Sequence, residues 1–198
     1  MLNPSWTVPP TILRNDVLPA VRKDPGYLAR QKMRVIDASG RTVDPRGIDW
    51  AAAAAGRFPY RIRQDPGPHN ALGRIKFELP NPHAVYLHDT PATQLFTRAE
   101  RAASSGCIRV ENPLELAVRL LGDPLRFGRE ALEAEIAKGD TRTIPLPVPV
   151  PVIFMYWTVE VDAQGQVSFR KDLYGRDPGL LRALDEDYSF GRSLAPHR

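Results

Sequence analysis

Proline is the residue that most limits the folds open to this chain. It supplies 20 of the 198 residues, about twice its usual share of roughly 5%. Because proline has no backbone N–H and a fixed φ, it ends helices and is excluded from central strands. Residues 145–151 alternate proline with leucine or valine, so they are expected to be polyproline-like or to lie along a sheet edge. The sequence therefore predicts short helices, many extended segments and many turns.

The remaining composition is that of an ordinary globular protein, with 42% apolar and 25% charged residues. A chain of this length is expected to form one domain over residues 1–198. The net charge of +4 comes from scattered basic residues rather than from a basic helix or arm, so nucleic-acid binding is not expected. A weakly cationic surface would suit an anionic polymer such as the cell wall.

Cys107 is the only cysteine, so the chain can form neither an intramolecular disulfide nor a cysteine cluster for zinc. No metal ion or cofactor is expected. No segment approaches the roughly 20 apolar residues of a membrane helix, and the first residues lack the basic and apolar regions of a signal peptide. The sequence is therefore expected to be cytoplasmic or an excised piece of a larger protein.

The expected elements change at the turn Asp65-Pro66-Gly67-Pro68. Before it, residues 14–60 carry broken helical patterns and predict a small, mostly helical subdomain. After it, alternating polar and apolar residues predict strands, and the capping pattern Asn112-Pro113-Leu114-Glu115 predicts a helix. The expected strands span 33–37, 73–79, 84–88, 152–161 and 167–173. The expected helices run from a cap at Asn15 or Asp16 to Val21, and over 51–55, 113–121 and 129–137.

Cys107 follows Ser104-Ser105-Gly106 and precedes Arg109 and the capped helix. A glycine turn can expose backbone N–H groups as an anion-binding nest. The helix N-terminus and the arginine would add positive charge, and all three features favour thiolate over thiol. A structural cysteine in a turn, with Arg109 in an ion pair, is an equally good interpretation of these residues alone.

A nucleophilic cysteine needs a base, and the chain offers four histidines. His197 lies in the tail and His69 in a proline turn, whereas His83 and His88 flank the strand expected at 84–88. Side chains alternate along a strand, so Tyr86 and His88 are expected on one face and His83 on the other. His88 at the end of this strand is the candidate base, although a structural histidine remains the alternative.

Several segments, in order, resemble the L,D-transpeptidase catalytic domain (YkuD-type). The family motif is a histidine, a gap, and Ser/Thr-His-Gly-Cys followed by a hydrophobic residue and Arg or Asn. Here His88 precedes Cys107 by 19 residues, but Ser105 stands where most members have histidine. A large-capping-loop branch of Gram-negative bacteria carries Ser-Ser-Gly-Cys instead. The further matching segments cover residues 3–11, 24–28, 66–74, 86–91 and 139–142 and the final hairpin.

The resemblance implies a fold of the α+β class, rich in β structure: a mixed-sheet sandwich in which residues 14–60 form an inserted helical capping subdomain. It implies that Cys107 attacks the carbonyl at the L-centre of diaminopimelate in a donor tetrapeptide stem, with His88 as base. Backbone N–H groups near Gly106 would form the oxyanion hole. Further oxyanion and supporting positions are Ser105, Asp89, Tyr86 and Arg109, and the residues expected to line the donor channel are Trp6, Tyr27 and Trp50.

The resemblance also implies the partners of this domain. They are peptidoglycan stem peptides as donor and acceptor, with β-lactams of the carbapenem class as covalent inhibitors, for a monomer in the periplasm or cell envelope. Water in place of the acceptor amine would make the protein an L,D-carboxypeptidase or an amidase, and loss of thiol reactivity would leave an inactive wall-binding module. A papain-like peptidase is disfavoured because its histidine follows its cysteine.

Overall fold

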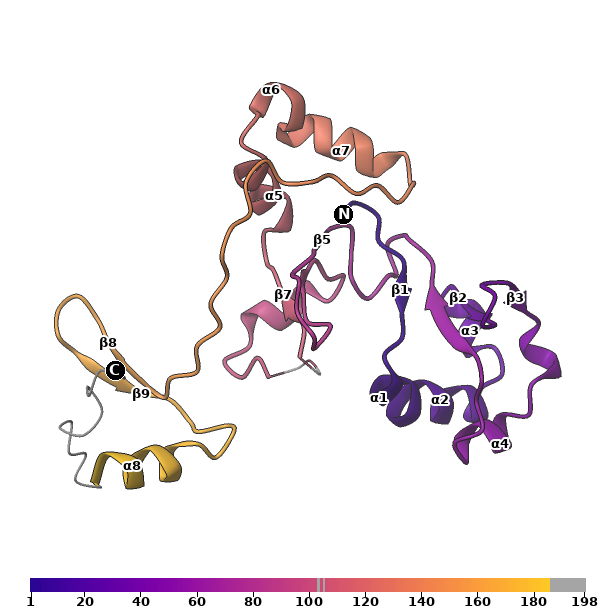
Figure 1. Ribbon diagram of the computed structural model, residues 1–198, viewed down its shortest axis with the longest axis horizontal. Coiled ribbons are helices and arrows are strands. Elements are labelled where there is room, and N and C mark those ends of the chain that lie inside the picture. Colours follow the sequence, from indigo (N-terminus) through magenta and orange to yellow (C-terminus); the bar gives the residue numbers. More distant parts are fainter. Residues whose placement is uncertain (103, 105, 186–198) are drawn as a thin grey trace, which may run out of the picture. The chain divides into compact units, whose positions relative to one another are not determined.

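The computed structural model describes residues 1–102, 104 and 106–185 (Figure 1). The chain forms two compact units, of which the first spans Met1–Pro149 and the second begins at Val150. Sequence patterns alone gave no sign of a boundary at this point. Among the described residues, no helix is long and apolar enough to cross a membrane.

The first unit contains a four-stranded antiparallel sheet in the order β1-β4-β2-β3. Its strands are β1 (Trp6–Thr7), β2 (Met33–Ile36), β3 (Thr42–Val43) and β4 (Arg61–Gln64). Helices make up most of the regular structure of residues 14–60, as predicted, and β2 lies where a strand was expected at 33–37, while β3 was not predicted. Strand β2 is held on both sides, by β3 and by β4, so residues outside the segment complete its sheet.

The helical stretch near the N-terminus begins earlier than expected. It runs from α1 (Pro10–Ile12) through the π-helix η1 (Leu13–Val17) into α2 (Leu18–Lys23). Proline at a first helical position lacks only an N–H that would be unpaired there, so Pro10 starts the helix and no cap at Asn15 is needed. The Leu18 N–H reaches back five residues to the Leu13 carbonyl. This widened turn accommodates Pro19, whose ring would crowd an ordinary α-helical turn.

Apolar side chains from these helices and from the sheet share one core. Its buried members are Val8, Val17, Val21, Leu28, Met33, Val35 and Ile62. Tyr27 from α3 (Tyr27–Arg30) and Trp50 from α4 (Trp50–Ala54) pack against it. Asp49 caps α4 by accepting hydrogen bonds from the Ala51 and Ala52 N–H groups, while the short 3-10 helix η2 (Pro45–Gly47) precedes it.

A second sheet of three strands carries the segment around the predicted site residues. Strand β6 (Leu87–His88) pairs antiparallel with β5 (Lys76–Phe77) and parallel with β7 (Ile108–Arg109). The expected strands at 73–79 and 84–88 are thus shorter than predicted. Ala84 has φ of +52°, outside the β region, and Asn81 bonds the backbone of residues 79, 83 and 85, which holds that segment as a loop. Together the sheets and helices confirm the α+β class.

The 3-10 helix η3 (Thr93–Thr97) precedes β7, and three helices that pack together follow β7. They are α5 (Pro113–Leu121), α6 (Pro124–Phe127) and α7 (Arg129–Ala137). The predicted bounds of α5 are confirmed, and Gly122 ends it in the left-handed conformation. The predicted capping box is wrong: the Asn112 side chain makes no cap bond, and Glu115 instead accepts from Arg119 and Arg129. Leu114, Ala117, Leu121 and Leu132 bury against Leu2 and Ile75.

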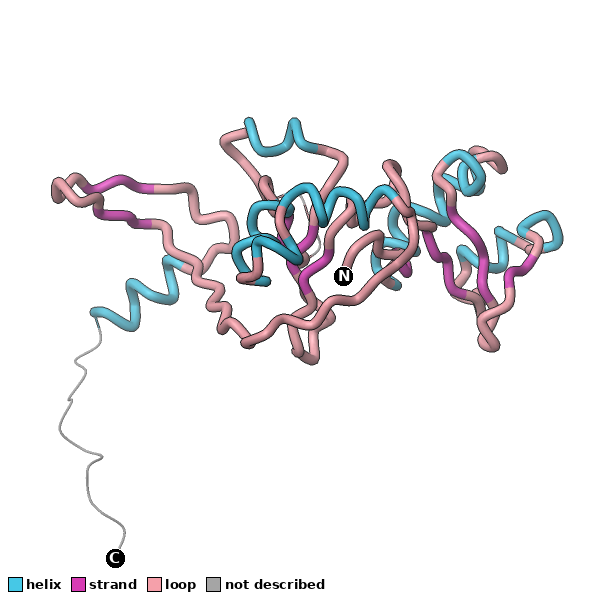
Figure 2. The backbone as a smooth tube through the Cα atoms, turned by 90° about the horizontal axis from the view of Figure 1, so that it is seen from above, coloured by secondary structure: helices cyan, strands magenta, loops and turns pink. Residues whose placement is uncertain are grey.

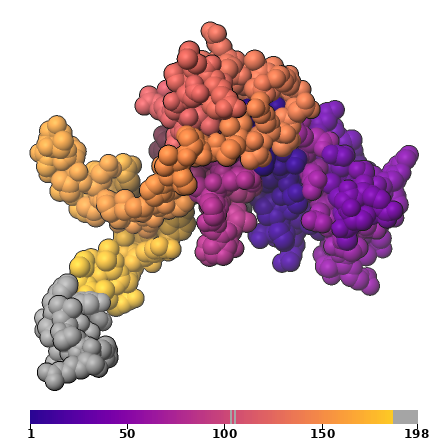
Figure 3. Space-filling view, turned by 45° about the horizontal axis from the view of Figure 1, so that its top comes forward, coloured from indigo at the N-terminus to yellow at the C-terminus, as the bar shows by residue number. Residues whose placement is uncertain are grey.

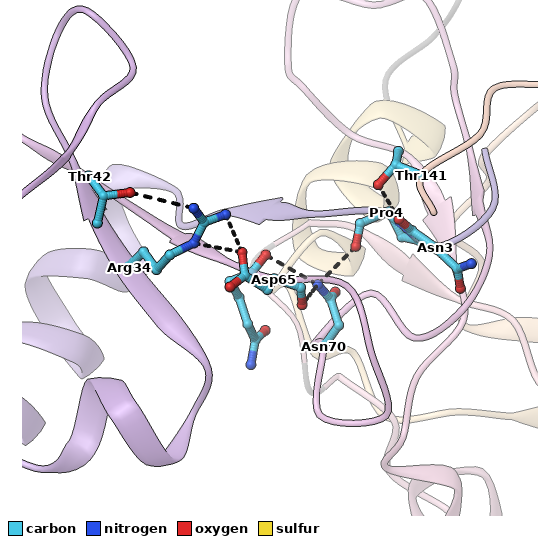
Figure 4. A network of polar contacts seen from close by, with 8 residues as sticks. Asn3, Pro4, Arg34, Thr42, Asp65, Asn70 and Thr141 are labelled. Atoms are coloured by element: carbon cyan, nitrogen blue, oxygen red, sulfur yellow. Dashed lines mark hydrogen bonds and ion pairs between the residues drawn. The ribbon is translucent and has the colours of Figure 1, made fainter. Parts of the chain in front are cut away.

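Buried amides tie the N-terminal segment to the two sheets (Figure 4). The Asn70 side chain is 1% exposed and donates to the Pro4 and Asp65 carbonyls, each at 2.9 Å. Asp65 in turn accepts from Arg34 of β2 at 2.8 Å. Thr141 donates to the Asn3 carbonyl at 2.6 Å. Two of these contacts join segments far apart in the chain, residue 3 with residue 141 and residue 4 with residue 70.

The second unit is a hairpin followed by a helix. Strands β8 (Val159–Val161) and β9 (Val167–Phe169) pair antiparallel, and α8 (Asp177–Asp185) follows. Both strands are shorter than predicted, and residues 145–151 form neither helix nor strand, as the prolines indicate (Figure 2). Figure 3 shows the described residues of this unit in orange and yellow, and its exposed apolar side chains include Phe154, Trp157 and Phe169. The frayed tail expected over the last ten residues lies outside the described residues.

Ile62 is the residue on which we expect the N-terminal core to depend most. It is 0% exposed and sits in β4 between β1 and β2. Ile62→Ala should lower the free energy of unfolding by about 2–5 kcal/mol, because the cavity left behind adds to the lost burial. Urea denaturation followed by tryptophan fluorescence measures this loss. Leu125→Ala, at a side chain 97% exposed, is the control, and an equal loss in both variants would contradict the assigned core.

Candidate active site

The parallel pairing of β6 with β7 brings His88 and Cys107 together. The register pairs Leu87 with Ile108 and His88 with Arg109, so Cys107 stands beside Tyr86 at the start of β7. The Ile108 N–H donates to the Tyr86 carbonyl at 3.0 Å, and the Val110 N–H donates to the His88 carbonyl at 2.8 Å. Two segments 19 residues apart in the sequence thus meet through backbone hydrogen bonds.

One face of these paired strands lines a cavity of about 450 Å³. Tyr86, His88, Cys107 and Arg109 reach the cavity, whereas Leu87 and Ile108 between them do not. This is the alternation of an extended strand, and the predicted shared face of Tyr86 and His88 is confirmed by ring centroids 5.8 Å apart. The cavity is also lined by Trp6, Ile12, Asp16, Ala71, Leu72 and His83.

The turn before Cys107 is organised by serine. The Ser104 hydroxyl donates to the Cys107 carbonyl at 2.7 Å and accepts from the Gly106 N–H at 3.3 Å. Gly106 has φ of +136°, a conformation that favours glycine. An oxyanion role of the Gly106 N–H would require exchange of this long bond to Ser104. Ser105 lies outside the described residues.

The two-residue strand β7 lies between Cys107 and α5 in the chain. The thiol contacts the loop before β6, with Sγ 3.9 Å from the Ala84 carbonyl oxygen. The cysteine is therefore held by a loop and a strand edge, and it is partly exposed toward the cavity.

His88 has an orientation that leaves one ring nitrogen as a base. Its Nδ1 lies 2.5 Å from the carbonyl oxygen of Asp89. A carbonyl can only accept a hydrogen bond, so Nδ1 carries the proton and Nε2 keeps its lone pair. The backbone carbonyl thus takes the place of the carboxylate that orients histidine in other nucleophilic sites.

Burial lowers the pKa of His88 below its ordinary value, and the positive charges of Arg109 and Lys76 act in the same direction. The hydrogen bond to the Asp89 carbonyl and the Asp89 charge oppose this shift. The imidazole is 5% exposed. At neutral pH it is therefore in the uncharged form, which is the form that accepts a proton.

Tyr86 interacts with both Cys107 and Trp6. Burial raises the pKa of Tyr86 to about 12, the charge of the Cys107 thiolate and hydrogen bonding to it add to this effect, and hydrogen bonding to Trp6 opposes it. The Lys76 ammonium stands 4.3 Å above the Tyr86 ring. A neutral phenol that donates a hydrogen bond to sulfur would hold the thiolate in position.

The other predicted site residues lie at different places in the fold. Tyr27 and Trp50 pack against the N-terminal core, and neither is among the described residues that line this cavity. Asp89 directs its carboxylate to the backbone N–H groups of Arg74 and Thr90 rather than to the thiol. His83 lines the cavity together with His88, so the expectation that it faces away is wrong: the loop at Ala84 breaks the strand alternation on which it rested.

Sequence patterns missed several residues of the site. Lys76 is the second cation near His88, and Ile12 and Asp16 line the cavity from the helical stretch that ends in α2. The alternation of residues 73–79 predicted that Lys76 lies on a strand. Its proximity to His88 and Tyr86 results from the pairing of β5 with β6, which the sequence did not predict. Within the described part of the chain, no group of three His, Cys, Asp or Glu residues could hold a metal ion.

A cysteine and an oriented, uncharged histidine beside one cavity are the groups that cysteine-dependent acyl transfer requires. The family model of the L,D-transpeptidase catalytic domain (YkuD) matches residues 1–151. The chain therefore belongs to this family of cysteine transpeptidase domains. It is 37% identical over 177 residues to a Haemophilus influenzae protein named "Putative L,D-transpeptidase". That alignment covers 89% of this chain and 35% of the relative, so the chain spans about a third of the relative's length.

The lowered pKa of His88 predicts the position of the acid limb of the pH–rate profile, which is the fall in rate as the pH decreases. The base works only when uncharged, so the rate should fall on the acid side at a pH below the ordinary histidine value of about 6.5. Lys76→Met removes a charge that lowers this pKa, and should move the limb to higher pH. Proton NMR titration of His88 measures the pKa directly. Arg57→Met is the control, because Arg57 is exposed and is not among the charges that shift the pKa of His88. A limb that stays in place would rule out the Lys76 effect.

Proposed function

We propose that this domain is a peptidoglycan L,D-transpeptidase that cross-links stem peptides through a Cys107 thioester. The observation that carries the proposal is the uncharged His88, with a free Nε2 lone pair, on the same cavity face as Cys107. Membership of the cysteine transpeptidase family supports it. The specific donor and acceptor follow from the resemblance to the large-capping-loop branch.

The proposed chemistry has two half-reactions. His88 Nε2 takes the thiol proton while Cys107 Sγ bonds to the carbonyl carbon at the L-centre of diaminopimelate in the donor tetrapeptide. The carbon–nitrogen bond to the terminal D-alanine then breaks, and His88 returns the proton to the leaving amine. The side-chain amine of a second diaminopimelate attacks the thioester, gives its proton to His88 and releases the cysteine. Backbone N–H groups at residues 106 and 107 would stabilise the oxyanion.

The cavity suits a peptide stem with charges of both signs. Its volume of about 450 Å³ is within the 300–1,000 Å³ range of ligand sites. Asp16 and Arg109 supply opposite charges to its lining, and Trp6 and Tyr86 supply aromatic surface. A meso-diaminopimelate side chain ends in an amine and a carboxylate, which such a lining could bind at separate points.

We propose further features that the branch resemblance implies. Residues 14–60 act as a cap, the sheets belong to a sandwich, the whole of 1–198 works as one catalytic domain, and the protein acts as a monomer in the periplasm or cell envelope. Ile12, just before the cap, and Asp16 within it support the cap because both line the cavity. Carbapenems would acylate Cys107 in place of the donor stem.

Hydrolysis is the alternative outcome of the same thioester. An L,D-carboxypeptidase or an amidase would use Cys107 and His88 unchanged and admit water in place of the acceptor amine. An inactive wall-binding module is disfavoured, because the oriented histidine and the partly exposed thiol are both present. Mass analysis of products formed with and without an acceptor stem separates transfer from hydrolysis.

Cys107→Ala should abolish turnover and covalent labelling. His88→Ala should lower the rate roughly a hundredfold or more, the usual contribution of a positioned base. Intact-protein mass spectrometry should show one carbapenem adduct on the wild-type chain and none on Cys107→Ala. His69→Ala is the control, because the exposed His69 is not among the residues that line the cavity. An adduct that persists in Cys107→Ala would remove this residue from the mechanism.

The cap should favour transfer over hydrolysis by excluding water from the thioester. Ile12→Ala and Asp16→Asn change cavity-lining side chains, and each should lower the ratio of cross-linked to hydrolysed product severalfold. Ile12 also packs against the N-terminal core, so its variant needs a control that loses the same packing. Ile48→Ala removes a side chain that packs on the same core outside the cavity lining and is the matched control. Product ratios measured at a fixed acceptor concentration give the answer, and an unchanged ratio in both cavity variants would exclude a lid role.

A further inference from the structure

The carbonyl that orients His88 belongs to Asp89, and the backbone N–H and both carboxylate oxygens of Asp89 also form hydrogen bonds. The Asp89 N–H donates to the Ile75 carbonyl at 2.8 Å. Its carboxylate accepts from the Arg74 N–H through Oδ2 at 2.8 Å and from the Thr90 N–H through Oδ1 at 2.7 Å. The Asp89 side chain is only 14% exposed. Residue 89 is therefore fastened to residues 74 and 75 by main chain and side chain together.

Gly73 makes this attachment possible. It has φ of +59°, and a Cβ at this residue would overlap the Asp89 carboxylate and lie 2.6 Å from the Asp89 Cβ. A real Cβ does not approach another atom so closely, so any side chain at residue 73 must displace Asp89. The two requirements of this position, a left-handed backbone and no side chain, are met only by glycine.

The turn that carries Gly73 is itself rigid. Asn70 Oδ1 accepts from the Leu72 N–H at 2.8 Å, and the Asn70 carbonyl accepts from the Gly73 N–H at 2.9 Å. The Asn70 amide is anchored to Pro4 and Asp65, as Figure 4 shows. The buried Gln64 side chain accepts from the Ala71 N–H at 2.9 Å. Residues 70–74 thus form a fixed platform against which Asp89 is held.

We propose that Gly73 and the Asp89 carboxylate are positioning residues for His88. The glycine leaves space for the carboxylate, the carboxylate fixes the Asp89 peptide on residues 70–74, and its carbonyl holds the imidazole with the proton on Nδ1. Neither group touches the nucleophile. This inference rests on the proposed role of His88 as base, and it deepens that role by naming what keeps Nε2 available.

The test compares two glycines with the same backbone conformation in the full 198-residue chain. Gly122 has φ of +66°, and a Cβ there would meet no atom of the described residues within 4 Å. Gly122→Ala therefore carries the left-handed strain without the collision. Gly73→Ala should lower kcat by about tenfold to a hundredfold, the scale of a small misplacement in a site, with KM close to wild type. Gly122→Ala should keep both constants.

The acid limb separates positioning from general loosening. The charged groups facing His88 are Asp89, Arg109 and Lys76, and only the Asp89 carbonyl and carboxylate raise its pKa. A carbonyl displaced in Gly73→Ala should therefore move the limb to lower pH. Loosening of the site would admit water, relieve the larger effect of burial and move the limb to higher pH, which would overturn the proposal.

Two further variants guard against a chain that merely fails to fold. Gly73→Asn adds a side chain that tolerates the left-handed region, and Asp89→Asn can accept only one of the two backbone N–H groups. Both should show the low-pH shift. Nitrogen NMR of the His88 ring needs no substrate, so it stands even if the proposed function fails: the proton should stay on Nδ1 in Gly122→Ala and leave it in the other variants. Wild-type spectra and rates throughout would refute the positioning role.

Discussion

The short parallel pairing between β6 and β7 is the interaction on which the site depends. Each strand has only two residues, yet the bonds from Ile108 to Tyr86 and from Val110 to His88 set which side chains face the cavity. A shift of one residue would turn Cys107 and His88 to opposite faces. The antiparallel partner β5 and the three-helix core behind it keep such a short pairing in register.

The pKa of the His88 imidazole results from effects that act in opposite directions. Burial and the cations Lys76 and Arg109 favour the uncharged ring, while Asp89 favours the charged one. A base must be uncharged before the reaction and charged during it, so both influences serve the same group at different stages. The nearest acidic residue acts mainly through its backbone, which adds little charge beside the thiol.

The N-terminal core and the cavity place different demands on neighbouring residues. The family resemblance placed Tyr27 and Trp50 in the donor channel, but both are partly buried and pack against the core that contains Val21 and Val35. Trp6, which lies on the edge strand β1 of the same sheet, reaches the cavity instead. Whether an aromatic side chain packs on the core or lines the cavity depends on the pairing of strands between residues 6 and 64. Local sequence patterns do not reveal this pairing.

Local sequence patterns correctly predicted the features that depend on near neighbours in the chain. These are the helices α5 and α7, the glycine turn before Cys107 and the lack of helix or strand over residues 145–151. The pairing of His88 with Cys107 followed from the family resemblance, not from local pattern. Tertiary structure alone decided the π-helix before Pro19, the sheet that completes residues 14–60, and the contact of Gly73 with Asp89. The physical reason is range: capping and turn preferences act over a few residues, whereas strand pairing and close packing join segments whose separation in sequence carries no signal of their contact.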